Sequence, residues 1–175
     1  MSTRSRIGIL NADGSIDSVY HHFDGYPEWL GVKLERNYTT SAKVRKLIEG
    51  GDISCIESDS DWKRNKLEKP IVLTYAMRGD ELRTAHHEDL KDFLMYDTCQ
   101  IEYSYLWNGS LSILNWSCWK ANYNYEWMIP EPPEVVQIPA LTNEEKEGDQ
   151  IALFAEKKAM KALGVGEKSL KAIYG

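Results

Sequence analysis

Apolar positions in the first part of the chain recur at every second residue, with a polar turn between two such runs. Ile7 and Ile9 precede the Asn-Ala-Asp-Gly segment 11–14, and Ile16 and Val19 continue the pattern after it. Two runs of strand-forming residues separated by Asn, Asp and Gly are typical of a β-hairpin, in which the glycine supplies a positive φ. The pattern therefore predicts a hairpin at the start of the chain.

The next apolar positions change to helical spacing. Segment 27–34 begins with a proline, which suits the first turn of a helix. The next helical segment, through residue 48, has Thr40 or Ser41 as its cap and ends at two glycines. The nearly continuous apolar run 70–77 predicts a strand in the centre of a sheet. Segment 86–94 is expected to form a helix that opens with two histidines and two acids.

A second hairpin and a helical tail are expected in the remainder. Residues 101–106 and 111–115 alternate around an Asn-Gly turn, which favours a hairpin. Four prolines interrupt residues 129–140, which should form an extended connector. Thr142 then caps the longest helix, with Glu145 as its capping-box partner.

These elements together predict an α+β fold. We expect a mainly antiparallel sheet built from two β-hairpins and a central strand, with the helices on one face. The core domain would span residues 1–128, followed by the Pro-rich connector 129–140. The helical extension 141–175 would pack on that core, although it could also pack on a second chain in a homo-oligomer. A length of 175 residues suits one such domain.

Composition narrows the function classes. Six Trp and ten Tyr argue against a disordered chain, and a net charge of −6 argues against direct DNA binding. No apolar run approaches the roughly 18 residues of a membrane span, and no apolar leader precedes the first strand. The three cysteines form no CxxC pair, so neither a zinc site nor a redox motif is expected. We therefore expect a cytoplasmic protein without a membrane partner.

Two segments are candidates for contact with a protein partner. Residues 49–61 contain five acids and no base, and residues 116–127 combine Trp and Tyr with polar residues. Acidic surfaces suit basic partners, and Trp and Tyr are preferred anchors of interfaces. The candidate partner-binding residues are Asp52, Glu57, Asp59, Asp61, Trp116, Trp119, Tyr123 and Trp127. The acidic segment could instead be a solvated loop, and the aromatic segment could cover the core.

The four histidines form two adjacent pairs, each followed by acids. His21 and His22 precede Asp24, and His86 and His87 precede further carboxylates. If the two pairs met in space, they could hold a divalent metal for a hydrolase. Neighbouring residues of a strand point to opposite faces, however, which argues against one site holding both His21 and His22. We therefore assign no metal and no other cofactor.

A small ligand is an alternative at the end of the first hairpin. His22, Asp24 and Tyr26, with aromatic neighbours, could line a pocket for a base or nucleotide. The same aromatic residues could equally form the edge of the core. The sequence contains no P-loop, no GxGxxG motif and no GxSxG nucleophile elbow, so it offers no support for an enzyme of those classes.

The start of the chain resembles a family of small, uncharacterised proteins of tailed bacteriophages and mobile elements. The resemblance rests on Met-Ser-Thr-Arg-Ser at residues 1–5, the strand 7–9, the Asp-Gly turn 13–14 and the Tyr-x-His-x-Asp-Gly-Tyr-Pro-Glu segment 20–28. It extends to Glu-Tyr-x-Tyr-Leu at residues 102–106, whereas the Trp-rich run and the C-terminal helix depart from it. The family has no agreed activity, so the resemblance implies an origin rather than a chemistry.

The sequence thus favours a phage-borne accessory protein that binds and inhibits a host or defence-system protein in the host cytoplasm, without catalysis. The alternatives are a sponge for a nucleotide signal, with its site at His22, Asp24 and Tyr26, and a metal-dependent hydrolase that uses the His pairs.

Overall fold

The computed structural model describes residues 2–56, 71–98, 100–108, 116–140 and 164. Its strands are β1 (Ser5–Leu10), β2 (Ile16–His21), β3 (Ile53–Ile56), β4 (Val72–Thr74), β5 (Ala85–His87), β6 (Tyr103–Trp107), β7 (Trp116–Asn124) and β8 (Ile129–Val136). Its helical elements are the π-helical turn η1 (Pro27–Gly31), α1 (Val32–Asn37), α2 (Ser41–Glu49), the 3-10 turn η2 (Ala76–Arg78) and α4 (Leu90–Met95).

The described strands form one mixed sheet in the order β4-β3-β2-β1-β6-β7-β8, with β5 paired to β2 off this path. β1 and β2 form the expected antiparallel hairpin. β1 is also parallel to β6, and β2 is parallel to β3. The α+β class is therefore confirmed, but the prediction of a mainly antiparallel sheet is wrong. Parallel neighbours arise because β6 and β3 reach the sheet through long connections rather than tight turns.

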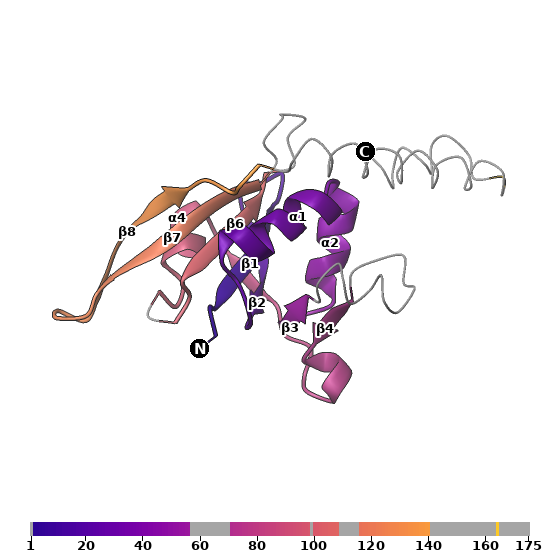
Figure 1. The fold of residues 1–175 in the computed structure, drawn as a ribbon, viewed down its shortest axis with the longest axis horizontal. Coiled ribbons are helices and arrows are strands. Elements are labelled where there is room, and N and C mark those ends of the chain that lie inside the picture. Colours follow the sequence, from indigo (N-terminus) through magenta and orange to yellow (C-terminus); the bar gives the residue numbers. More distant parts are fainter. Residues whose placement is uncertain (1, 57–70, 99, 109–115, 141–163, 165–175) are drawn as a thin grey trace.

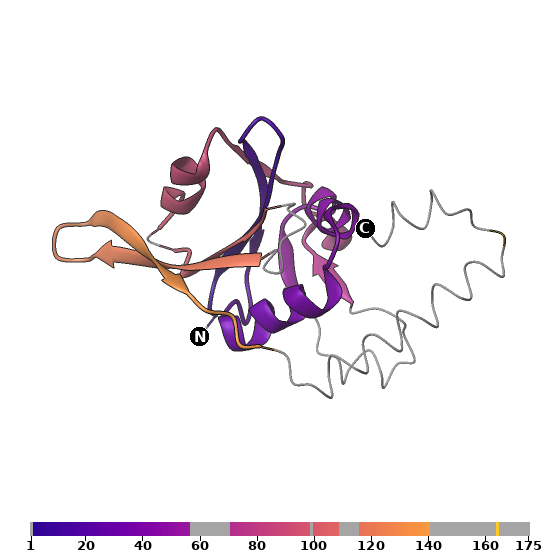
Figure 2. The same cartoon turned by 90° about the horizontal axis from the view of Figure 1, so that it is seen from above.

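Helices cover both faces of this sheet, contrary to the expectation of one (Figure 2). The first face packs Ile7, Ile9 and Val19 against residues of η1, α1 and α2 in the larger core cluster. The second face packs Ile16 and Leu106 against Phe93 of α4. Successive strand residues point to opposite faces, so one strand contributes to both cores.

The second core depends on a close approach at Gly8 of β1. A Cβ at this position would lie 2.9 Å from Ile16 Cγ2 and 2.9 Å from Phe93 Cε2. The Phe93 ring therefore packs against the backbone of the sheet, where a larger residue would displace it.

Three local predictions failed where sheet pairing decided the structure. Segment 70–77 contributes only the short strand β4, which lies at the edge of the sheet rather than its centre and leads into η2. His86 and His87 belong to β5 instead of a helix, and α4 begins after the cap Asp89. Residues 129–136 form β8 instead of an unpaired connector. The prolines are tolerated there because β8 is an edge strand, which needs hydrogen-bond donors on one side only.

The return strand expected at 111–115 and the helix expected after Thr142 lie outside the described residues. The strand that pairs with β6 begins at Trp116, and this antiparallel pairing runs from Tyr103 opposite Lys120 to Trp107 opposite Trp116.

The hairpin of β7 and β8 is longer than the strand beside it. β6 begins at Tyr103, opposite Lys120, whereas β7 continues beyond Lys120 to Asn124 and pairs there with β8 alone. The far end of this hairpin projects away from the body (Figures 1 and 2). We call residues 122–131 the β7–β8 arm. Only two strands support it, so it gains little of the stability that a wider sheet provides.

Candidate functional site

A Ser–His pair lies on each face of the sheet. On the first face, Ser5 and His21 are paired residues of β1 and β2, and Ser5 Oγ lies 3.1 Å from His21 Nδ1. Only 1% of the His21 surface is exposed. Burial is the main cause that lowers the His21 pKa to about 3, and the charges of Lys33 and His22 contribute less. His21 is therefore a neutral core residue.

The second Ser–His pair, Ser18 and His87, belongs to a larger polar cluster. Ser18 Oγ lies 2.7 Å from His87 Nε2 and accepts a hydrogen bond of 3.0 Å from the Arg6 guanidinium. Asp92 Oδ2 is 3.8 Å from His87 Nδ1, and the Tyr96 ring covers Arg6 at 4.6 Å. This order of serine, imidazole and carboxylate has the connectivity of a hydrolytic triad.

The second pair nevertheless lacks what a triad needs. Ser18 and His87 have no exposed surface, and the distance from His87 to Asp92 exceeds that of a hydrogen bond. Burial, followed by the charge of Arg6, lowers the His87 pKa. The cluster can hold α4 and β5 on the sheet, but a substrate has no path to the Ser18 hydroxyl.

The two His pairs lie at opposite ends of β2. β5 pairs His87 with Ile16 and His86 with Asp17, whereas His21 ends the strand. The four steps along β2 from Asp17 to His21 span about 13 Å at the usual rise of a strand. Among the described residues, no three His, Cys, Asp or Glu side chains are placed to hold one metal ion. The geometry on which the metal-dependent hydrolase rested is thus not found.

The structure places His22, Asp24 and Tyr26 in the turn between β2 and η1. His22 Nδ1 lies 2.6 Å from the Tyr20 hydroxyl, and its ring packs edge-on against Phe23. Asp24 is exposed and has a positive φ of 58°. These residues shape the turn into η1.

The turn into η1 is held by close backbone packing at Gly25. The Gly25 carbonyl accepts a hydrogen bond of 2.7 Å from the Tyr105 hydroxyl, and its N–H donates to the Thr3 carbonyl at 2.9 Å. A Cβ at Gly25 would lie only 2.7 Å from Thr3 O. The Asp-Gly-Tyr-Pro segment therefore has a structural reason to contain glycine.

The candidate partner-binding residues are divided between core and surface. Trp116 is buried and donates from Nε1 to the Tyr38 carbonyl at 2.9 Å, so it serves the core. Trp119 is half-buried beside the second core. Asp52 accepts a hydrogen bond of 2.8 Å from the Tyr20 N–H, which binds the start of β3 to β2. Glu57, Asp59 and Asp61 lie outside the described residues.

Trp127, by contrast, lies at the tip of the β7–β8 arm. Four apolar side chains are adjacent there and largely exposed, namely Tyr125 at 72%, Trp127 at 68%, Met128 at 67% and Ile129 at 52%. The candidate segment 116–127 contains Tyr125 and Trp127, of which only Trp127 was named as a binding residue, and Met128 and Ile129 were missed. The available signal in the sequence was that Met128 and Ile129 directly continue the apolar run after Trp127.

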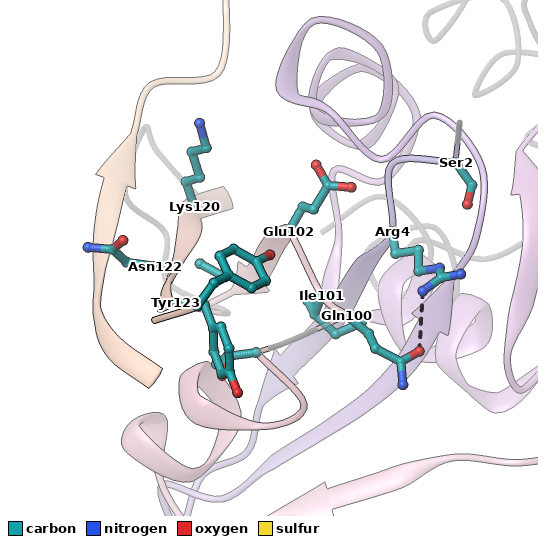
Figure 3. Close-up of a pocket in the computed structure, with 11 residues that line it drawn as sticks. Ser2, Arg4, Gln100, Ile101, Glu102, Lys120, Asn122 and Tyr123 are labelled. Atoms are coloured by element: carbon teal, nitrogen blue, oxygen red, sulfur yellow. Dashed lines mark hydrogen bonds between the residues drawn. The ribbon is translucent and has the colours of Figure 1, made fainter. Parts of the chain in front are cut away.

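A cavity of about 460 Å³ lies where the arm joins the body (Figure 3). Arg4 and residues 100–102 line it from the body, and Lys120, Tyr123 and Tyr125 line it from β7 and the arm. Arg4 Nη1 donates to Gln100 Oε1 at 3.3 Å. The rings of Tyr123 and Tyr125 meet edge to face, with centroids 5.0 Å apart. Sequence reasoning selected only Tyr123 among these residues.

Within the described parts of the chain, no helix is both long enough and apolar enough to cross a bilayer. Comparisons with protein-family models, with curated proteins and with solved structures found no match to this chain.

Proposed function

We propose that this protein is a non-catalytic binding protein that inserts the tip of the β7–β8 arm into an apolar site of a protein partner. The observation that carries this proposal is the adjacent exposure of Tyr125, Trp127, Met128 and Ile129 at the end of a projecting hairpin. Exposed apolar residues that are scattered need no explanation, whereas a contiguous group is typical of an interaction surface.

The residue types at the tip suit a binding anchor. Trp and Tyr provide large apolar surfaces with few rotatable bonds, and they dominate the binding energy of many interfaces. The side chains, rather than the backbone of β8, should make the contact. Pro130, Pro132 and Pro133 deprive this edge strand of N–H donors, so pairing with a strand of the partner is disfavoured.

The charges near the tip indicate the rim of the partner site. Glu126 lies within the tip, and Glu131 and Glu134 follow on β8. An apolar pocket bordered by Lys or Arg would complement this surface and accelerate association. Because the start of the chain resembles phage-borne proteins, a host or defence-system protein is the partner class that we propose. The acidic segment 49–61 is a proposed second contact.

Binding through the tip can be tested with paired variants. We expect Trp127→Ala to weaken partner binding by about 2 kcal/mol or more, which is roughly 30-fold in Kd. Met77→Ala is the matched control, because Met77 is 68% exposed on η2. Tagged protein would capture the partner from bacterial host lysate, and calorimetry with the purified partner would then measure the Kd of each variant.

Two results would overturn this proposal. One is a stoichiometric partner that Trp127→Ala binds as tightly as the unchanged protein does. The other is sedimentation data in which the protein alone forms a dimer that Trp127→Ala dissociates, since the tip would then be occupied by a second copy of this chain.

A further inference from the structure

The tip of the β7–β8 arm has little support from the rest of the sheet, so its shape depends on contacts within the arm. Residues 122–124 of β7 pair with β8 only, and the last pair is Asn124 opposite Ile129. Residues 125–128 form the loop between the two strands. A two-stranded hairpin is marginally stable in water, and exposed side chains on it would ordinarily sample many conformations. The apolar anchors of the tip therefore need restraints of their own.

Asn124, the last residue of β7, supplies two restraints through one side chain. Its Oδ1 accepts a hydrogen bond of 3.1 Å from the Trp127 N–H in the loop. Its Nδ2 donates to Glu131 Oε1 at 3.3 Å on β8. A carboxamide offers both an acceptor and a donor, whereas a carboxylate offers acceptors only. One side chain thus ties the backbone of Trp127 to both strands of the arm.

Two further features hold the ends of the loop. Tyr125, its first residue, packs edge to face against Tyr123 with ring centroids 5.0 Å apart. Met128, its last residue, has a φ of 52°. This left-handed conformation is uncommon for a residue other than glycine, and it persists only where the surrounding structure determines it. The loop therefore has restraints at its start, at Trp127 and at its end.

We propose that Asn124 is the positioning residue of the arm, which holds loop 125–128 in the conformation in which Trp127 binds. The consequence for binding rests on the proposed function, whereas the order of the loop in the free chain does not. A restrained anchor loses less conformational freedom on association than a flexible one. The loop that Asn124 orders therefore binds more tightly than a flexible loop with the same apolar side chains.

The first test measures the order of the loop in the free, full-length chain by NMR. Asn124→Ala should speed hydrogen exchange of the Trp127 amide about fivefold, because that amide loses its acceptor. The same variant should lower the heteronuclear NOE of the backbone amides of residues 125–128. Asn122→Ala is the matched control, because it truncates an exposed asparagine two residues earlier on the same strand. It should leave both quantities unchanged.

A paired exchange of side chains separates positioning from a general loss of structure. Asn124→Asp keeps an acceptor for the Trp127 N–H but sets a carboxylate against Glu131, so it should order the loop only in part. Adding Glu131→Gln supplies an amide that can donate to the new carboxylate, and the double variant keeps the net charge of the chain. The double variant should recover the exchange rate of the unchanged protein within about twofold.

The second test measures binding to the protein that the unchanged chain captures from bacterial host lysate and that Trp127→Ala fails to capture. Asn124→Ala should raise the Kd for that purified protein about fivefold, and the double variant should recover the affinity. Asn122→Ala should leave the Kd unchanged. If Trp127→Ala does not alter capture, the proposed function fails, whereas the NMR test still decides whether Asn124 orders the loop.

Three results would overturn the inference. The first is a Trp127 amide that exchanges equally fast in the unchanged protein and in Asn124→Ala. The second is a double variant that behaves like Asn124→Ala in both tests. The third is an Asn124→Ala chain with a disordered loop but an unchanged Kd for the captured protein, because binding would then not depend on the order of the loop.

Discussion

The buried histidine of the first Ser–His pair makes a quantitative prediction about stability and pH. His21 has a pKa of about 3 in the folded chain, because burial disfavours its charged form, and an ordinary value of 6.5 when unfolded. Between these two values the unfolded chain binds a proton that the folded chain does not. Stability must therefore fall as the pH decreases below about 6.5. The loss continues until the pH reaches the folded-state value.

The magnitude follows from this difference in pKa. Each pH unit within the window costs about 1.4 kcal/mol in the free energy of unfolding. Between pH 7 and pH 5 the contribution of His21 is about 2 kcal/mol, since titration of the unfolded chain is only beginning at pH 7. His21→Gln removes the titration, and the amide can still bond to Ser5 Oγ. The variant is expected to be less stable at pH 7 but to lose about 2 kcal/mol less on acidification.

Urea unfolding followed by tryptophan fluorescence at the two pH values provides the measurement. His22→Gln is the matched control, because His22 is only half-buried and removing it should alter the pH dependence much less. Equal losses of stability in the unchanged protein and in His21→Gln would refute the assignment of His21 as a neutral core residue.

Further predictions concern the first turn, the surface histidine and a helix cap. Gly25→Ala should lower the free energy of unfolding by about 1–3 kcal/mol, because a Cβ would lie only 2.6–2.7 Å from neighbouring atoms. An unchanged urea midpoint of unfolding would contradict this packing. A hydrogen bond of 2.6 Å to Asp17 raises the His86 pKa. Asp17→Asn should therefore lower the His86 pKa in an NMR titration. An unchanged His86 pKa would exclude this hydrogen bond. Thr40→Ala should lower the free energy of unfolding by about 1 kcal/mol, because it removes the acceptor for the Lys43 N–H. Thr40→Ser keeps a hydroxyl acceptor and should retain most of that stability.

Turn and cap chemistry allowed the local elements near the start of the chain to be predicted. The β1–β2 hairpin was predicted because Gly14 follows Asn and Asp between two alternating runs, and Gly14 indeed has a φ of 88°. A cap at Thr40 or Ser41 and a helix end at Gly50–Gly51 were predicted for the same reason, and α2 has Thr40 as its N-cap and Gly50 as its C-cap. Each of these signals lies within a few residues of the feature that it determines.

Pairing between distant segments could not be predicted in this way. His86 and His87 have acids after them, as a helix start would, yet pairing with β2 makes them part of a strand. The prolines of residues 129–136 suggested a connector, yet the edge position of β8 accommodates them. In both cases, tertiary contacts outweighed local preference.

The candidate sites show the same division. Composition selected Trp127 as a candidate anchor. The arm projects with that residue at its tip because β6 begins only opposite Lys120. The cavity gave no sequence signal, because its lining comes from distant segments that only the order of β1, β6 and β7 brings side by side.

The sequence by itself determined the α+β class, the first hairpin and the capped helix, since turn residues and apolar periodicity act locally. The tertiary structure alone decided which strands are neighbours, which aromatic residues are buried and which are exposed. Those outcomes depend on how distant segments share the burial of apolar surface, and no single stretch of sequence contains that information.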